Sequence, residues 1–160
     1  MTDPSDALPL FQQAMTLGHI PVQQGALDKS IYIATEDVNG HHRLSYMKLR
    51  DRTILALVQF VSIDPLDGIP CFQAGYAVPE IFRRQGLAKS SFEAALAEMV
   101  QGFSRLGDFY VEAVVGYDNL ASQKISEAVL GGSPQEITDS VSGKQALRYL
   151  RRCGVGKGTV

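Results

Sequence analysis

The sequence predicts a single α/β (α+β) domain built on a mixed, mostly antiparallel sheet of about six to seven strands flanked by helices. Three observations lead to this prediction. Four extended runs between residues 30 and 78 are separated by turn-forming residues, as in an antiparallel meander. A strand, a long amphipathic segment over 86–106 and another strand follow, and this order predicts a parallel crossover. Two further extended runs, over 135–139 and 145–152, form a closing hairpin.

Length and composition are those of an ordinary soluble globular domain. The 160 residues are 45% hydrophobic and 20% charged, and fifteen basic against seventeen acidic residues leave a formal net charge of −2. This balance predicts neither a nucleic-acid surface nor an anionic-membrane surface. The first residues are polar and acidic, and no apolar run approaches the roughly twenty residues of a membrane span. We therefore expect a cytoplasmic protein without nucleic-acid or membrane partners.

The chain is expected to form one domain from its first helix onward. Residues 1–29 are predicted to form a helix and a loop that belong to the same domain as the sheet. The helix covers 6–18, and Asp6 or Ser5 would cap it. The glycine-rich segment 153–160 is expected to be a flexible tail.

The meander is marked by its turns. Asn39-Gly40 separates two alternating runs, which is a strong sign of a β-hairpin. A polar turn over 50–52 and another over 64–68 separate the runs that follow. The four strands are predicted over residues 30–36, 42–49, 53–62 and 69–78.

The second half of the chain contains two predicted helices. Apolar residues recur at steps of three and four over 86–106, so this segment should be the longest helix, ended by Gly107. A strong β run follows over 109–115. Asp118 or Asn119 can then cap a second helix.

The cysteines and histidines predict no metal site. Cys71 and Cys153 lie far apart without metal-ligand spacing, and Cys71 lies in an apolar strand pattern typical of a buried thiol. His41 and His42 are neighbours at the hairpin, so on a strand they would point to opposite faces. We interpret both histidines as solvated turn residues.

One stretch, from Gly75 to Ala88, predicts an anion-binding turn. It begins as an apolar strand, breaks at Pro79, and passes Arg83 and Arg84 before a helix opens. Unpaired N–H groups at a helix start, together with the helix dipole, favour a phosphate there. The alternative is a plain strand-to-helix turn with a solvated basic edge.

The spacing Arg83-x-x-Gly86-x-Ala88 resembles the acetyl-CoA pyrophosphate loop of the GCN5-related N-acetyltransferase (GNAT) superfamily. The order of predicted elements over residues 30–152 is also similar to that of this superfamily. A second local match is Asn119-x-x-Ser122, which resembles the opening of the family helix beside the coenzyme. Plain helix capping by Asn119 is the alternative and is compatible with that role.

The resemblance implies an acetyl-CoA site. In the family, the strand before the loop splays from its parallel neighbour and pairs with the pantetheine arm, as an added strand would. Arg83 or Arg84 could add a charge contact to the diphosphate. The implied coenzyme residues are Tyr76, Ala77, Val78, Arg83, Arg84, Gln85, Gly86, Leu87, Ala88, Asn119 and Ser122.

The catalytic residues are less clearly implied. Many family members use a tyrosine of the second helix as general acid, and here that position falls at or near Ser126. Tyr117 is the nearest replacement, ahead of Tyr76 and Tyr110, although an aromatic packed at a strand end is the alternative. Glu112 could act as a base through water, or it could be salt-bridged or face the surface.

These features predict an acetyl-CoA-dependent N-acyltransferase. It would move an acetyl group directly, without an acyl-enzyme, to a primary amine of a small molecule or a protein. The first alternative is a non-catalytic acyl-CoA-binding module, for which the missing helix tyrosine is the sequence sign. The second is a domain of this fold that self-associates through its final hairpin, and the sequence leaves a homodimer open.

Overall fold

The structure, a computed structural model, describes residues 3–154 and confirms the predicted fold class. A mixed sheet of eight strands has the order β1-β2-β3-β4-β5-β6-β8-β7, and only β5 and β6 pair in parallel. The elements are α1 (Pro4–Leu17), β1 (Gln23–Gln24), β2 (Ile31–Val38), β3 (His41–Arg50), β4 (Thr53–Leu66), β5 (Ile69–Ala77), a 3₁₀ turn (Glu80–Phe82), α2 (Leu87–Gly102), β6 (Phe109–Gly116), α3 (Leu120–Leu130), β7 (Gln135–Thr138) and β8 (Gln145–Cys153).

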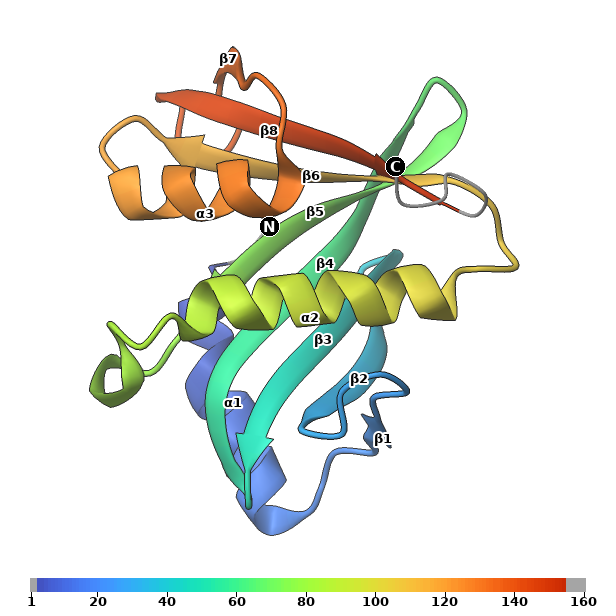
Figure 1. Cartoon of the computed structure of the whole chain (residues 1–160), viewed down its shortest axis with the longest axis vertical. Coiled ribbons are helices and arrows are strands. Elements are labelled where there is room, and N and C mark those ends of the chain that lie inside the picture. The colour runs from blue at the N-terminus through green and yellow to red at the C-terminus, as the bar shows by residue number, and fades with distance from the viewer. Residues whose placement is uncertain (1–2, 155–160) are drawn as a thin grey trace.

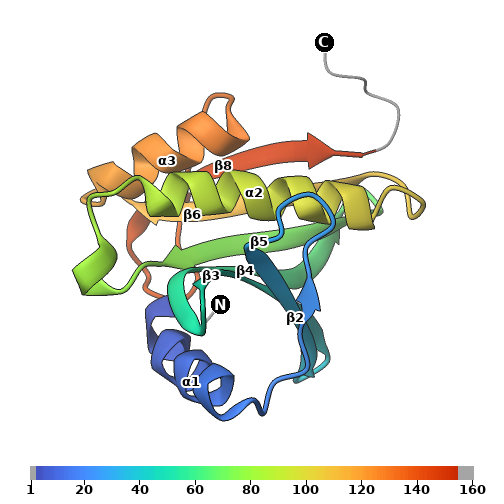
Figure 2. The same ribbon diagram turned by 60° about the horizontal axis from the view of Figure 1, so that its bottom comes forward.

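The helices cover both faces of the sheet. Helices α2 and α3 lie on one face, and α1 lies on the other (Figure 2). On the α2 face, the Phe92 ring packs 6.1 Å from Phe60 and 5.6 Å from Tyr76, measured between ring centroids. On the opposite face, Phe11 of α1 packs with Met47. Within residues 3–154, none of the helices has the length and apolarity required to span a bilayer.

Strands β5 and β6 pair over only part of their length. The parallel register joins Cys71–Gln73 to Tyr110–Glu112, whereas β5 continues to Ala77 and β6 to Gly116. Figure 1 shows the two strands diverging toward the start of α2 and α3. Beyond Gln73, the edge of β5 that faces β6 therefore has no strand partner among the described residues.

The N-terminal region differs from its prediction in two ways. Helix α1 begins at Pro4, and its cap is Asp3, whose carboxylate accepts a hydrogen bond from the Ser5 N–H at 2.9 Å. The predicted caps Asp6 and Ser5 are therefore wrong. Proline suits the first helical position because it has no N–H to leave unpaired, and this signal could have located the start. The predicted loop also contains the short strand β1, which pairs with β2.

Two other boundaries also differ from prediction. Strand β4 runs through the predicted turn to Leu66 and ends at Asp67-Gly68, where φ is +51° and +75°. Positive φ at both central residues is typical of a tight two-residue hairpin. Helix α2 ends at Gly102 rather than near Gly107, because Phe103 turns inward to pack against Phe109, with 5.3 Å between ring centroids.

The Asn39-Gly40 hairpin is confirmed, with φ of +51° and +81° at the two residues. His41 and His42 beside it are exposed. The predicted tail begins one strand residue too early, since Cys153 ends β8, and residues 155–160 lie outside the described part of the chain.

A buried carboxylate holds the segment before β2 against α2. Glu98 of α2 is 4% exposed, and its carboxylate accepts hydrogen bonds from the backbone N–H groups of Ala26, Leu27 and Asp28 at 2.9, 2.7 and 2.7 Å. The three N–H groups replace the water molecules that the carboxylate lost when it was buried. This contact joins segments about seventy residues apart, and the helical pattern of the sequence gave no sign of it.

Replacing Glu98 by alanine should destabilise the fold by about 2–4 kcal/mol, because three backbone N–H groups lose their acceptor in a buried place. Urea denaturation of Glu98→Ala and of the control Glu93→Ala measures this. Glu93 lies on the same helix with 52% of its side chain exposed, and removing it should change the free energy of unfolding by no more than about 0.5 kcal/mol. Equal stability of the two variants would contradict a structural role for Glu98.

Candidate active site

A hollow of about 620 Å³ lies where β5 and β6 diverge. Its walls come from the end of β5, the loop that follows, the first turn of α2, the first turns of α3 and, at Ser5, the first turn of α1. All of the predicted coenzyme residues except Gln85 line it. The lining residues are Ser5, Tyr76, Ala77, Val78, Phe82, Arg83, Arg84, Gly86, Leu87, Ala88, Lys89, Asn119, Ala121, Ser122 and Ile125.

The loop before α2 is shaped to present N–H groups. Arg84 and Gly86 both have left-handed backbone, with φ of +64° and +73°. Left-handed residues among right-handed ones turn successive N–H groups toward one side and form an anion-binding nest. A non-glycine residue pays roughly 1–2 kcal/mol for this conformation, so Arg84 is a strained position at the edge of the hollow.

Helix α2 begins without a cap of its own. Its N-cap is Gly86, no side chain from residues 3–154 bonds its first N–H groups, and no acidic residue lies in its first turn. By contrast, Asp3 caps α1 and Asn119 caps α3. The free N–H groups and the positive end of the helix dipole therefore face the hollow with no internal partner.

Three cationic side chains lie at this end of the hollow. The Arg83 Nε donates to the Val78 carbonyl at 3.1 Å, which ties the loop to the end of β5. Arg84 is exposed beside it, and the Lys89 ammonium lies 3.9 Å from Glu93. Together with the helix start, these groups suit a ligand that carries several negative charges.

Helix α3 opens as predicted. The Asn119 side-chain oxygen accepts a hydrogen bond from the Ser122 N–H at 3.2 Å, so Asn119 is the N-cap. Both residues also line the hollow. Capping and ligand contact are compatible here, because the capping bond uses only the side-chain oxygen of Asn119 and does not involve its Nδ2.

Tyr76 is the tyrosine that lines this hollow. It comes from β5 and donates to the Ser122 carbonyl of α3 at 3.5 Å, and burial raises the pKa of Tyr76. Beside it, the Ser126 hydroxyl is buried and has no hydrogen-bond partner within residues 3–154. The resemblance implies a tyrosine at or near Ser126 in other family members, and in this chain the Tyr76 side chain, from a strand, lies beside Ser126.

Tyr117 lies elsewhere. Its side chain is 43% exposed, it does not line the hollow, and it faces Glu136 of β7. Partial burial and this neighbouring carboxylate raise the pKa of Tyr117.

Glu112 lies at the last parallel pair before β5 and β6 separate. Its neighbours Val111 and Ala113 belong to the core under α2, so the alternation of a strand directs Glu112 to the opposite face. There its carboxylate accepts from Arg148 Nε at 2.6 Å and from Gln73 Nε2 at 3.2 Å. Of the readings that the sequence left open, the salt-bridged one is observed.

The Cys71 thiol, which lies near Glu112 and Arg148, is not suited to act as a nucleophile. Cys71 is 2% exposed, and burial, followed by the nearby Glu112 carboxylate, raises its pKa to about 11. A thiol with that pKa is neutral at physiological pH. Within residues 3–154, three or more metal-binding side chains are nowhere grouped so as to hold an ion.

No protein-family model matches the sequence, and no curated protein does. Solved structures do match, and the fold is that of the GNAT acetyltransferases. This confirms, for the fold, the resemblance seen in the sequence.

Three solved structures illustrate the match. A ribosomal-protein-S5-alanine acetyltransferase from Vibrio fischeri is 14% identical, with a TM-score of 0.54 over 69% of this chain and 61% of its own. RimJ from Mycobacterium smegmatis, in complex with CoA-disulfide, is 16% identical, with a TM-score of 0.50 over 71% of this chain and 54% of its own. A chimera of the spermidine N-acetyltransferase SpeG from Vibrio cholerae and hSSAT is 14% identical, with a TM-score of 0.50 over 71% of this chain and 67% of its own. This chain thus spans less than two thirds of the first two.

Proposed function

We propose that the protein is an acetyl-CoA-dependent N-acetyltransferase that transfers the acetyl group directly to a primary amine of a small molecule or a protein. The observation that carries the proposal is the hollow at the β5–β6 divergence, which joins an uncapped helix start to a half-buried tyrosine. The solved structures of the same fold support it: one holds a coenzyme A derivative, and the others are named for protein and polyamine acetylation.

The residues divide between the two ends of the coenzyme. The backbone of Arg84 to Ala88 would receive the diphosphate, with Arg84 as a charged contact. The free edge of Ala77 and Val78 would pair with the amides of the pantetheine arm. Asn119 and Ser122 would flank that arm from α3.

The chemistry requires two proton movements. Acetyl-CoA supplies an activated acyl group, whose transfer forms a C–N bond, breaks the C–S bond and releases the coenzyme thiol. Tyr76 is the one tyrosine among the described residues that line this hollow, so we assign it the proton that goes to the departing sulfur. Glu112, on the opposite face, would take the amine proton through water, while Arg148 and Gln73 hold its orientation. Tyr117 is the alternative acid.

A non-catalytic acyl-CoA-binding module is the second candidate. It is favoured by one specific observation, the ion pair that occupies Glu112, since a carboxylate oxygen that accepts a hydrogen bond from an arginine is less free to accept one from a water. Release of free thiol from acetyl-CoA in the presence of an amine decides between the two functions, because a binding module would release none.

Calorimetry tests the coenzyme site on which both candidates depend. We expect acetyl-CoA to bind with a dissociation constant of roughly 1 μM to 1 mM. Pantetheine, which lacks the diphosphate, should bind at least about tenfold more weakly, because it makes no contact with the start of α2. Absence of binding at millimolar acetyl-CoA would exclude the enzyme and the binding module alike.

A further inference from the structure

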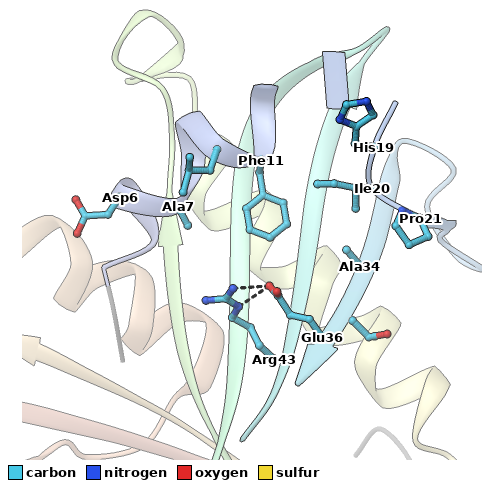
Figure 3. A pocket seen from close by; sticks show the side chains of 11 residues that line it. Asp6, Ala7, Phe11, His19, Ile20, Pro21, Ala34, Glu36 and Arg43 are labelled. Atoms are coloured by element: carbon cyan, nitrogen blue, oxygen red, sulfur yellow. Dashed lines mark hydrogen bonds and ion pairs between the residues drawn. The ribbon is translucent and has the colours of Figure 1, made fainter. Parts of the chain in front are cut away.

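A second hollow, of about 550 Å³, lies on the α1 face of the sheet, opposite α2 and α3. Figure 3 shows it between α1, the segment after α1, and the floor formed by β2 and β3. Its walls are mostly apolar, with Leu10 and Phe11 on the helix side and Ile20 and Ala34 across from them. A cavity of this size and lining suits a small ligand with an apolar body.

The two hollows share the first turn of α1. Ser5 lines the coenzyme hollow, whereas Asp6 and Ala7 line the second one. Helix α1 also packs against β5, and Figure 3 shows Asp6 and Ala7 beside the end of that strand. A ligand in the second hollow would therefore have its Asp6 end next to the coenzyme hollow.

The charges in the second hollow are arranged for a single cation. Glu36 is paired with Arg43, whose Nε and Nη2 both donate to Glu36 Oε1, at 2.7 and 2.5 Å, so this pair is neutral overall. The Asp6 carboxylate is exposed and makes no hydrogen bond or ion pair with any residue from 3 to 154. His19 also lines the hollow, and Figure 3 shows it on the opposite side of Phe11 from Asp6. The one carboxylate of the hollow without a cationic partner among the described residues is thus at the end that adjoins the coenzyme hollow.

We propose that this hollow binds the acceptor, and that the acceptor is a primary amine on an apolar body, such as an arylalkylamine. Its ammonium group pairs with Asp6, and its body lies between Leu10 and Ile20. The inference rests on the proposed function and narrows its acceptor class. A polyamine is disfavoured because its second ammonium would meet a neutral pair that includes Arg43. The N-terminus of a protein is disfavoured because a polar backbone would follow it into an apolar hollow.

The first test measures binding without the coenzyme, so it can fail independently of the proposed function. Saturation-transfer NMR of the full chain with 2-phenylethylamine should show saturable binding, weakened about tenfold in Asp6→Asn and threefold to tenfold in Leu10→Ser. Asp64→Asn removes an exposed carboxylate of β4 outside both hollows and should bind as the wild type does. Because Asp6 and Leu10 are both exposed, these variants should fold. Absence of saturable binding, or equal binding by Asp6→Asn, overturns the inference.

The second test compares the rates at which different amines are acetylated, measured by the release of free thiol from acetyl-CoA. Turnover of 2-phenylethylamine should exceed that of spermidine and of an alanine-terminated peptide by at least about tenfold in kcat/KM. Asp6→Asn should lower kcat/KM mainly through KM while leaving the affinity for acetyl-CoA unchanged. Faster turnover of spermidine or the peptide overturns the acceptor class but supports the proposed function. Failure of acetyl-CoA to bind overturns the proposed function, and the NMR experiment then decides the hollow alone.

Discussion

Replacing Gly86 by glutamate is expected to weaken acetyl-CoA binding by at least about a hundredfold, or roughly 2.8 kcal/mol. Gly86 is the uncapped start of α2, and its φ of +73° lies in the region that favours glycine. The new side chain would place a carboxylate at the helix N-terminus, where it would satisfy the free N–H groups and repel the diphosphate. Isothermal titration calorimetry measures the change.

Gly107→Glu is the matched control for this variant. Gly107 follows α2 at its other end, also has a positive φ, of +94°, and has open space around its missing side chain. The two variants therefore add the same charge and comparable backbone strain, of about 1 kcal/mol. Only Gly86→Glu should bind acetyl-CoA more weakly than the wild type does. Equal affinities for acetyl-CoA in the two variants would move the diphosphate site away from the α2 start.

Replacing Tyr76 by phenylalanine is expected to lower kcat by about a hundredfold or more, which is the usual contribution of a general acid. The ring should keep its packing against Phe92. Within residues 3–154 the hydroxyl donates one long hydrogen bond, to the Ser122 carbonyl, so the fold and the coenzyme affinity should change little. Steady-state kinetics by thiol release, with calorimetry for acetyl-CoA, separate the loss of kcat from a loss of binding.

Tyr117→Phe distinguishes the two tyrosines. Tyr117 is partly exposed beside Glu136 and lies outside the coenzyme hollow, so its loss should change kcat by less than about threefold. The reverse pattern, with Tyr117→Phe inactive and Tyr76→Phe active, would return the acid role to Tyr117. It would also leave Tyr76 as a packing residue of the hollow.

If Tyr76 is the general acid, its pKa determines how kcat depends on pH at the alkaline end. A general acid acts in its protonated form, so its contribution is present below its pKa and is lost as the pH rises through it. Burial raises the pKa of Tyr76 above the ordinary value near 10. The kcat profile should therefore show no alkaline decline attributable to this group between pH 7 and 10.

Local signals predicted a large part of the fold. Asn39-Gly40 located a hairpin because its two residues adopt positive φ readily, and the three-and-four spacing after Gly86 located α2 because one face of a helix must be buried. The start of α1 and the turn at Asp67-Gly68 were misplaced, although Pro4 and the Asp-Gly pair signalled both. The early end of α2 carried no such signal, since it depends on Phe103 packing against residues of other elements.

The sequence by itself determined that the segment from Arg83 to Ala88 is a glycine-containing turn that opens a helix, because glycine placement, strand breaking and helix opening are properties of neighbouring residues. Only the tertiary structure decided what surrounds that loop. The approach of Tyr76 to Ser122 and Ser126, the pairing of Glu112 with Arg148, and the shared wall formed by α1 all join residues that are distant in sequence. Such contacts depend on strand register and helix packing, which one-dimensional patterns constrain only through burial.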